Sequence, residues 1–158
     1  MKEGDKSVPT LFEWAGGMPA LEKTFVRFYE KVRQDEMLAP LFAQMSAEHP
    51  RFVTQFVAEV LGGPSAYSET HGGHPHMMTR HLNRHLTDAQ RKHWMTLLLE
   101  TADETGLPND PEFRSALVGY LEWGSRLAVI NSQPGAAADP KAPMPRWNWG
   151  PPGGPYQP

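Results

Sequence analysis

Residues 62–81 read GGPSAYSETHGGHPHMMTRH, a segment rich in glycine and histidine. It begins with Gly62-Gly63-Pro64, which is a strong stop signal for the apolar helix pattern that precedes it. From Pro64 to about Thr79 the hydrophobic residues follow no clean period, so the pattern predicts a long loop within a compact domain. Such loops usually carry function or are disordered. Five of the chain's seven histidines lie in or just after this segment, at His71, His74, His76, His81 and His85.

The apolar spacing on both sides of this segment is helical, and no stretch shows the sustained alternation that marks a β-strand. Strong start and stop signals support this pattern, such as the capping box Thr87-Asp88-Ala89-Gln90 and the stop at Gly106. The sequence therefore predicts an all-α protein. We expect helices over residues 10–15, 19–32, 47–61, 78–85, 88–105 and 111–128.

The length of 158 residues suits one domain. Prolines are concentrated at the end of the chain: eight of the sixteen lie between residues 134 and 158. This segment is incompatible with a packed helix or sheet. We therefore expect a folded domain over residues 8–132 and a flexible Pro/Gly-rich tail over residues 133–158, which Trp147, Trp149 and Tyr156 can pin in part.

Charge and hydropathy restrict the partners. Fifteen Lys and Arg residues against eighteen Asp and Glu give a net charge of -3, which disfavours a protein that binds nucleic acid through bulk charge. No stretch approaches the apolar length needed to cross a membrane, so neither nucleic acid nor a membrane is an expected partner. The first six residues are mostly charged and no apolar run follows them, so we expect a cytoplasmic protein.

Cysteine is absent, which excludes disulfides, thiolate zinc sites, iron–sulfur clusters, covalently attached haem and a cysteine nucleophile. Three interpretations of the histidines remain. The histidines are solvated surface residues, or one of them ligates haem iron from a short helix beside an apolar cavity. In the third interpretation they hold a transition metal, either at His71, His74 and His76 with Glu69 or at His81 and His85 one helical turn apart.

A resemblance favours haem. Residues 62–81 resemble the segment of group II truncated haemoglobins that leads to their iron-ligating histidine. Arg27-Phe28-Tyr29 resembles the distal tyrosine motif of that group, and Trp94 lies thirteen residues beyond His81, where the group carries its pocket tryptophan. The resemblance covers about residues 10–131 and implies a truncated globin, a two-over-two helical sandwich that encloses non-covalent haem b. The Pro-rich tail lies outside it.

The resemblance also implies a role for individual residues. His81 would be the proximal iron ligand, and Tyr29, Trp94 and His49 would face a ligand on the distal side. Arg80 would bind a haem propionate, because a guanidinium bonds a carboxylate in a bidentate manner. The other expected haem contacts are Phe42, Val53, Phe56, Trp94 and, for a propionate, Tyr67.

Two positions depart from the commoner pattern of the group. Phe42 stands where many members carry a polar Tyr or His, and His49 stands where many carry a small residue. Tyr29, Trp94 and His49 therefore remain as the donors to a bound ligand. At about 1 kcal/mol per hydrogen bond, two donors would slow ligand escape roughly thirtyfold. In an alternative arrangement His49 itself reaches the iron.

The resemblance implies a bacterial globin that binds oxygen reversibly, as in oxygen transport, along with other small ligands. Redox chemistry on nitric oxide, peroxide or sulfide, of a dioxygenase or peroxidase kind, stays open. The sequence carries no flavin or nicotinamide motif, so an electron donor would be a separate reductase. We expect a monomer or a homodimer. The alternative function is a helical partner-docking module that works through Arg146-Trp147-Asn148-Trp149 in its tail.

Overall fold

The computed structural model describes residues 8–158, and across that range it contains α-helices and one 3-10 helix but no strand. The prediction of an all-α fold is confirmed. In chain order the elements are α2 (Leu11–Ala15), α3 (Gly17–Val32), η1 (Ala39–Phe42), α4 (His49–Val60), α5 (Ala66–His71), α6 (Gly73–Thr79), α7 (Asp88–Thr105) and α8 (Pro111–Asn131).

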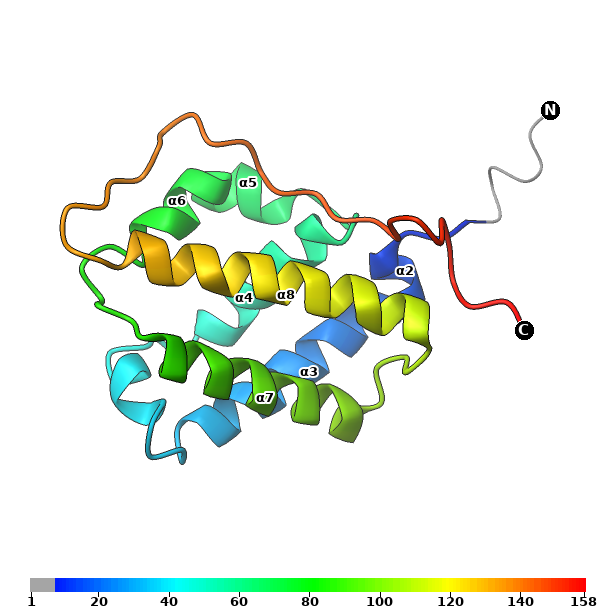
Figure 1. The fold of residues 1–158 in the computed structure, drawn as a ribbon, viewed down its shortest axis with the longest axis horizontal. Coiled ribbons are helices and arrows are strands. Elements are labelled where there is room, and N and C mark those ends of the chain that lie inside the picture. The colour runs from blue at the N-terminus through cyan, green and yellow to red at the C-terminus, as the bar shows by residue number, and fades with distance from the viewer. Residues whose placement is uncertain (1–7) are drawn as a thin grey trace.

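The four long helices form two layers. α7 and α8 lie in front in Figure 1, and α3 and α4 lie behind them. α3 packs against both α4 and α7, and α7 packs against α8. The centre of the core is apolar and fully buried, with Phe28 and Phe113 both 0% exposed. This is the predicted two-over-two helical sandwich.

Side-chain caps fix where α7 and α8 begin. Thr87 accepts a hydrogen bond from the Gln90 amide while the Gln90 side chain accepts one from the Thr87 amide, which completes the predicted capping box of α7. Asp110 accepts a hydrogen bond from the Phe113 amide at the start of α8. Gly106, in the left-handed conformation with φ of 85°, ends α7 as the sequence predicts.

The predicted loop between Pro64 and Thr79 is wrong, because this segment forms α5 and α6. Each helix has only six or seven residues, too few to display a hydrophobic period. A contact from outside the segment supports α5: the buried Glu59 carboxylate accepts hydrogen bonds from the Ser68 amide at 2.9 Å and from the Ser68 hydroxyl at 2.5 Å.

The prediction of a short helix over residues 78–85 is also wrong, because the helix lies earlier in the chain. α6 ends at Thr79, and residues 80–83 form a turn. Asn83 and His85 have positive φ angles of 60° and 54°, which are incompatible with a continuing right-handed helix. His81, the expected iron ligand, therefore lies in a turn after α6 rather than within a helix.

Residues 133–158 form no helix or strand and run back across the domain surface, past α5, α6 and α8, to end beside α2 (Figure 1). Trp149 is 7% exposed, and its indole N–H donates a hydrogen bond to the Pro9 carbonyl at 2.8 Å. Trp149 thus pins part of this segment, whereas Tyr156 is exposed, and the flexibility of the segment stays a prediction. Among the residues from Val8 onward, no helix combines the length and apolar character needed to span a membrane.

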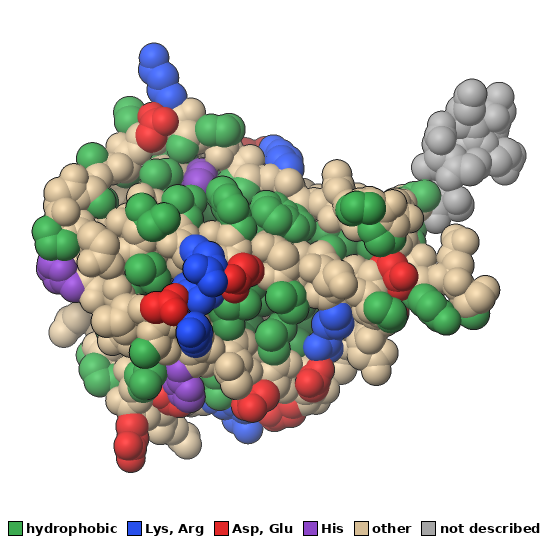
Figure 2. Space-filling view, viewed as in Figure 1, with side chains coloured by type: hydrophobic (Ala, Val, Ile, Leu, Met, Phe, Trp, Pro, Cys, Tyr) green, Lys and Arg blue, Asp and Glu red, His purple; other side chains and the backbone are tan. Residues whose placement is uncertain are grey.

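The surface in Figure 2 carries hydrophobic side chains over the α8 side of the molecule, with acidic and basic side chains interspersed. Val118, Trp123 and Ile130 are exposed apolar residues of α8. Arg91 crosses from α7 to this side and pairs with Glu122 at 3.0 Å. This ion pair joins α7 to α8, and Arg91 is also one of the residues that line the internal cavity.

Candidate functional site

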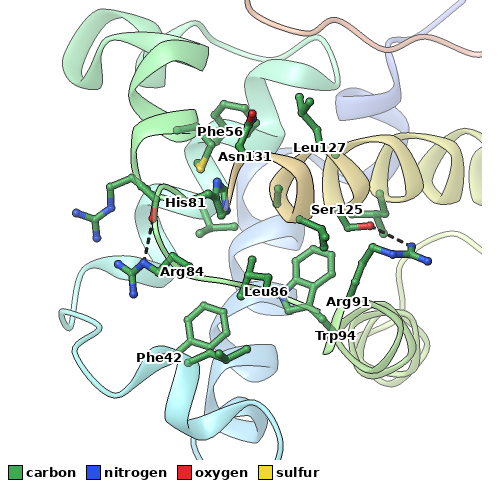
Figure 3. Close-up of a pocket in the computed structure, with 18 of the residues that line it drawn as sticks. Phe42, Phe56, His81, Arg84, Leu86, Arg91, Trp94, Ser125, Leu127 and Asn131 are labelled. Carbon is green, nitrogen blue, oxygen red and sulfur yellow. Dashed lines mark hydrogen bonds between the residues drawn. The ribbon is translucent and has the colours of Figure 1, made fainter. Parts of the chain in front are cut away.

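A largely apolar cavity of about 250 Å³ lies between the two helix layers. Side chains from α3, η1, α4, α6, α7 and α8 line it, together with residues on either side of η1 and in the segment that follows α6. Every wall therefore depends on the tertiary fold. Figure 3 shows side chains from several of these elements converging on the same space.

The structure brings together eight of the nine residues selected from the sequence. The cavity-lining members of that set are Tyr29, Phe42, His49, Val53, Phe56, Arg80, His81 and Trp94. Tyr67 is the exception, because it is not among the lining residues. Its ring is 2% exposed and packs edge-on against Phe56, with ring centroids 5.0 Å apart. Tyr67 thus supports the wall from behind.

His81 projects into the cavity from the turn after α6 (Figure 3). Burial lowers the pKa of His81 to about 4, while a hydrogen bond with the Met77 backbone acts in the opposite direction. The imidazole is therefore neutral at neutral pH. A neutral ring whose other nitrogen is held by a backbone hydrogen bond is the usual form of a metal-ligating histidine.

Tyr29 lies at the cavity wall on α3 and is 3% exposed. Burial raises the pKa of its phenol above the ordinary value, and a hydrogen bond with the Trp94 side chain opposes this shift. The hydroxyl is consequently protonated and able to donate. Its ring packs edge-on against Phe42 and His49, with centroids 5.5 and 4.8 Å away.

His49, at the start of α4, carries a buried polar atom without a partner. Its Nε2 atom is buried and has no hydrogen-bond partner among the residues described. Burial, followed by the nearby charges of Arg80 and Arg84, lowers the pKa of His49 to about 4. An unpaired buried nitrogen costs about 1–3 kcal/mol, which points to a molecule in the cavity that bonds to it.

Arg80 and Arg84 are exposed side chains that belong to the cavity lining. Arg84 Nε donates a hydrogen bond to the Arg80 carbonyl at 3.1 Å, which ties the turn around His81 (Figure 3). Two guanidinium groups beside an apolar cavity suit a ligand that is apolar in its body and anionic at its edge. Sequence reasoning missed Arg84, although its place three residues after His81 is a usable signal.

The hypothesis that these histidines hold a transition metal ion directly, without haem, is wrong. Within residues 8–158 no group of three or more His, Asp or Glu side chains is arranged to hold a metal ion. The His71 and His76 rings stack on each other at 6.1 Å, and His74 bonds instead to the Pro143 carbonyl. His85 does not lie on a helix, so it does not form the proposed one-turn pair.

The residues present therefore fit haem, since a neutral imidazole, apolar walls and a cationic rim meet in one cavity. The family model for bacterial-like globins matches residues 10–122. A group 2 truncated hemoglobin of Bacillus subtilis is 34% identical over 117 residues, which cover 74% of this chain and 86% of that protein. The chain belongs to the group II truncated haemoglobins.

Solved structures agree with this assignment. The group II truncated hemoglobin of Bacillus anthracis superposes with a TM-score of 0.70 at 29% identity, over 80% of this chain and 96% of that one. The truncated oxygen-avid haemoglobin of Bacillus subtilis gives a TM-score of 0.68 at 33% identity, over 77% and 99%. This truncated haemoglobin is therefore a haem-binding globin that binds oxygen, with non-covalent haem b. These comparisons give no support to a partner-docking module.

Three further cavity residues of this truncated haemoglobin were missed from the sequence: His74 of α6, and Tyr120 and Trp123 of α8. Tyr120 follows the helical spacing of the core, so its pattern does not distinguish a cavity wall from ordinary packing. His74 was grouped with its sequence neighbours, whereas the fold turns it toward the cavity and leaves His76 exposed.

Proposed function

We propose that this truncated haemoglobin holds oxygen beside Tyr29, Trp94 and His49 and releases it slowly, with His81 as the protein ligand to the iron. The haem, when bound, supplies an iron atom that coordinates oxygen reversibly. The observation that carries the proposal is the buried, unpartnered His49 Nε2, whose ring packs against that of Tyr29.

The polar groups in this corner of the cavity differ in what they offer. The Tyr29 hydroxyl is protonated and donates, and the Trp94 indole N–H is a donor only. His49 donates through Nε2 when its proton resides on that nitrogen. With about 1 kcal/mol for each hydrogen bond, two donors slow escape of a diatomic ligand roughly thirtyfold relative to an apolar pocket.

The remaining lining residues have simpler roles in this proposal. Phe42, Val53 and Phe56 supply apolar surface that packs on the haem and keeps water out. Arg80 and Arg84 bind the haem carboxylates at the cavity rim, where their exposure leaves the charged ends in contact with solvent.

A second candidate function, redox chemistry on nitric oxide, peroxide or sulfide, is favoured by the same cluster of donors, because several donors polarise a bound ligand. Its electrons would come from a separate reductase.

We further propose that the protein is cytoplasmic and works as a monomer or homodimer. Cell fractionation tests the location, and sedimentation tests the oligomeric state.

The first experiment is visible absorption of the purified, haem-reconstituted protein in ferric, reduced and carbon-monoxide-bound forms. A sharp Soret band that moves on reduction and on carbon monoxide binding is expected for the wild-type protein. His81→Ala should degrade this band, whereas His76→Ala, a matched control at an exposed histidine of α6, should leave it unchanged. If both variants gave the same spectra, His81 would not be the protein ligand to the iron.

A further inference from the structure

The segment after α8 makes three anchored contacts with separate parts of the globin domain. The Pro143 carbonyl lies 3.1 Å from His74 Nδ1 on α6. The Trp147 amide donates to the carbonyl of Val60, the last residue of α4, at 2.9 Å. The third contact is the hydrogen bond from Trp149 to Pro9. Figure 1 shows this segment crossing from the α6 side to the α2 side of the molecule. Residues 143–149 are called the strap below.

Trp147 of the strap packs against α8. Its ring lies 5.5 Å from that of Tyr120 and 5.7 Å from that of Trp123. The Trp147 indole also lies over Gly119, where a Cβ atom would be in ordinary contact with the indole nitrogen at 3.6 Å. The indole is thus seated on α8 between two aromatic side chains.

Three partners of the strap are themselves walls of the haem cavity. His74 lines the cavity from α6, and Tyr120 and Trp123 line it from α8. The His74 and Trp123 rings approach each other at 5.9 Å, but α6 packs mainly on α5 and has few direct backbone contacts with α8. The strap therefore joins two walls that the rest of the fold connects only weakly.

We propose that the strap ties α6 to α8 and that Trp147 is a positioning residue for the proximal side of the haem. α6 ends two residues before His81, so holding α6 holds the turn from which His81 projects. Because haem leaves only when a wall of its cavity opens, the strap slows haem loss. This inference rests on His81 holding the haem, as proposed above.

The test measures transfer of haem from the reconstituted full-length protein to an excess of an apomyoglobin acceptor. Deletion of residues 134–158 and Trp147→Ala should each speed haem loss by roughly tenfold, a change of about 1.4 kcal/mol in the barrier. Trp147→Phe should restore most of the slow loss, since a ring still fills the site on α8. Tyr156→Ala, at a residue 49% exposed, is the matched control and should match the wild-type rate.

Two further readouts separate positioning from general loss of stability. The iron–histidine stretching band in resonance Raman spectra should shift in Trp147→Ala and return in Trp147→Phe. Hydrogen exchange should rise in α6 of Trp147→Ala and stay unchanged in α3 and α7. Three results would each overturn the proposed role of the strap. They are equal rates of haem loss in the wild-type protein and Trp147→Ala, an unshifted iron–histidine band in Trp147→Ala, and an equal rise of hydrogen exchange in every helix. A full-length protein that binds no haem would instead overturn the proposed function, while the exchange pattern would still report on the strap.

Discussion

The carboxylate of Asp35, in the turn after α3, lies 2.5 Å from Nε2 of His93 on α7. The same carboxylate accepts hydrogen bonds from the Met37 and Leu38 amides at 3.0 Å each. One side chain thus orders the start of the segment that leads to η1 and fastens it to α7. The His93 hydrogen bond is the main reason why the pKa of Asp35 is lowered.

A pH dependence follows from this pair. Because the folded-state pKa of Asp35 is lowered, its contribution to stability is present above the unfolded-state pKa of about 3.9 and is lost as the pH falls through the lower folded value. We expect Asp35→Asn to reduce the free energy of unfolding at pH 7 by about 0.5 kcal/mol, because the pair is partly exposed. The amide oxygen still accepts from the turn.

Urea unfolding at a series of pH values checks this. The difference between wild type and Asp35→Asn should shrink toward zero as the solution becomes more acidic than the unfolded-state pKa. Glu36→Gln is the matched control at an exposed neighbouring carboxylate and should give a flat difference. A deficit of Asp35→Asn that persists unchanged in acid would contradict the assignment.

The distal donors predict the rates of oxygen dissociation. Tyr29→Phe removes one hydroxyl donor from the cavity and should speed dissociation about fivefold, the value of about 1 kcal/mol. Combined with Trp94→Phe, the increase should approach roughly thirtyfold. Stopped-flow mixing with carbon monoxide measures these rates, and Tyr156→Phe, at an exposed tyrosine, is the control. If oxygen dissociation were unaltered in the double variant, neither Tyr29 nor Trp94 would donate a hydrogen bond to the ligand.

We expect substitution of His49 to weaken the hold on oxygen without lowering the stability of the haem-free protein. His49→Leu should speed oxygen dissociation about fivefold if the ring donates to the ligand. In the haem-free protein the same change replaces an unpartnered buried nitrogen by an apolar group, so the free energy of unfolding should stay equal or rise. Loss of stability without a change in dissociation rate would make His49 a packing residue only.

Because Glu59 is buried, we expect substitution of its partner Ser68 to lower the stability of the protein strongly. Ser68→Ala removes the hydroxyl that bonds to this carboxylate, and Glu59 is 0% exposed, so the haem-free protein should lose about 1–3 kcal/mol of stability. Ser65→Ala breaks the chemically equivalent but exposed Ser65–Glu69 hydrogen bond and should cost less than about 0.5 kcal/mol. Urea unfolding compares them, and equal losses would refute the argument from burial.

The parts of the fold that the sequence predicts well are those set by local signals. α7 and α8 begin at their predicted caps, because Thr87 and Asp110 act within one turn of chain. α5 and α6 were missed because they depend on contacts across the fold, such as the hydrogen bonds from Ser68 to Glu59. Short helices with nonlocal support carry little local signal.

The candidate site divides in the same way. Tyr29, His81 and Trp94 were found through their resemblance to a known pattern, and the structure brings all three to one cavity. His74 and Tyr120 were missed because no local spacing relates α6 to α8. Their shared wall exists only when the chain is folded, which is also why Tyr67, selected from the sequence, lies behind the cavity instead of in it.

The hydrogen bond from Trp149 to Pro9 joins residues 140 positions apart and so brings the two ends of the described chain together. Closing so long a loop is entropically costly, and this contact forms only when residues near both ends of the described chain are in place. The described residues that line the cavity all lie at or before Asn131. The strap is therefore the part of the described chain that follows every cavity wall, and it closes over a pocket that the preceding residues already specify.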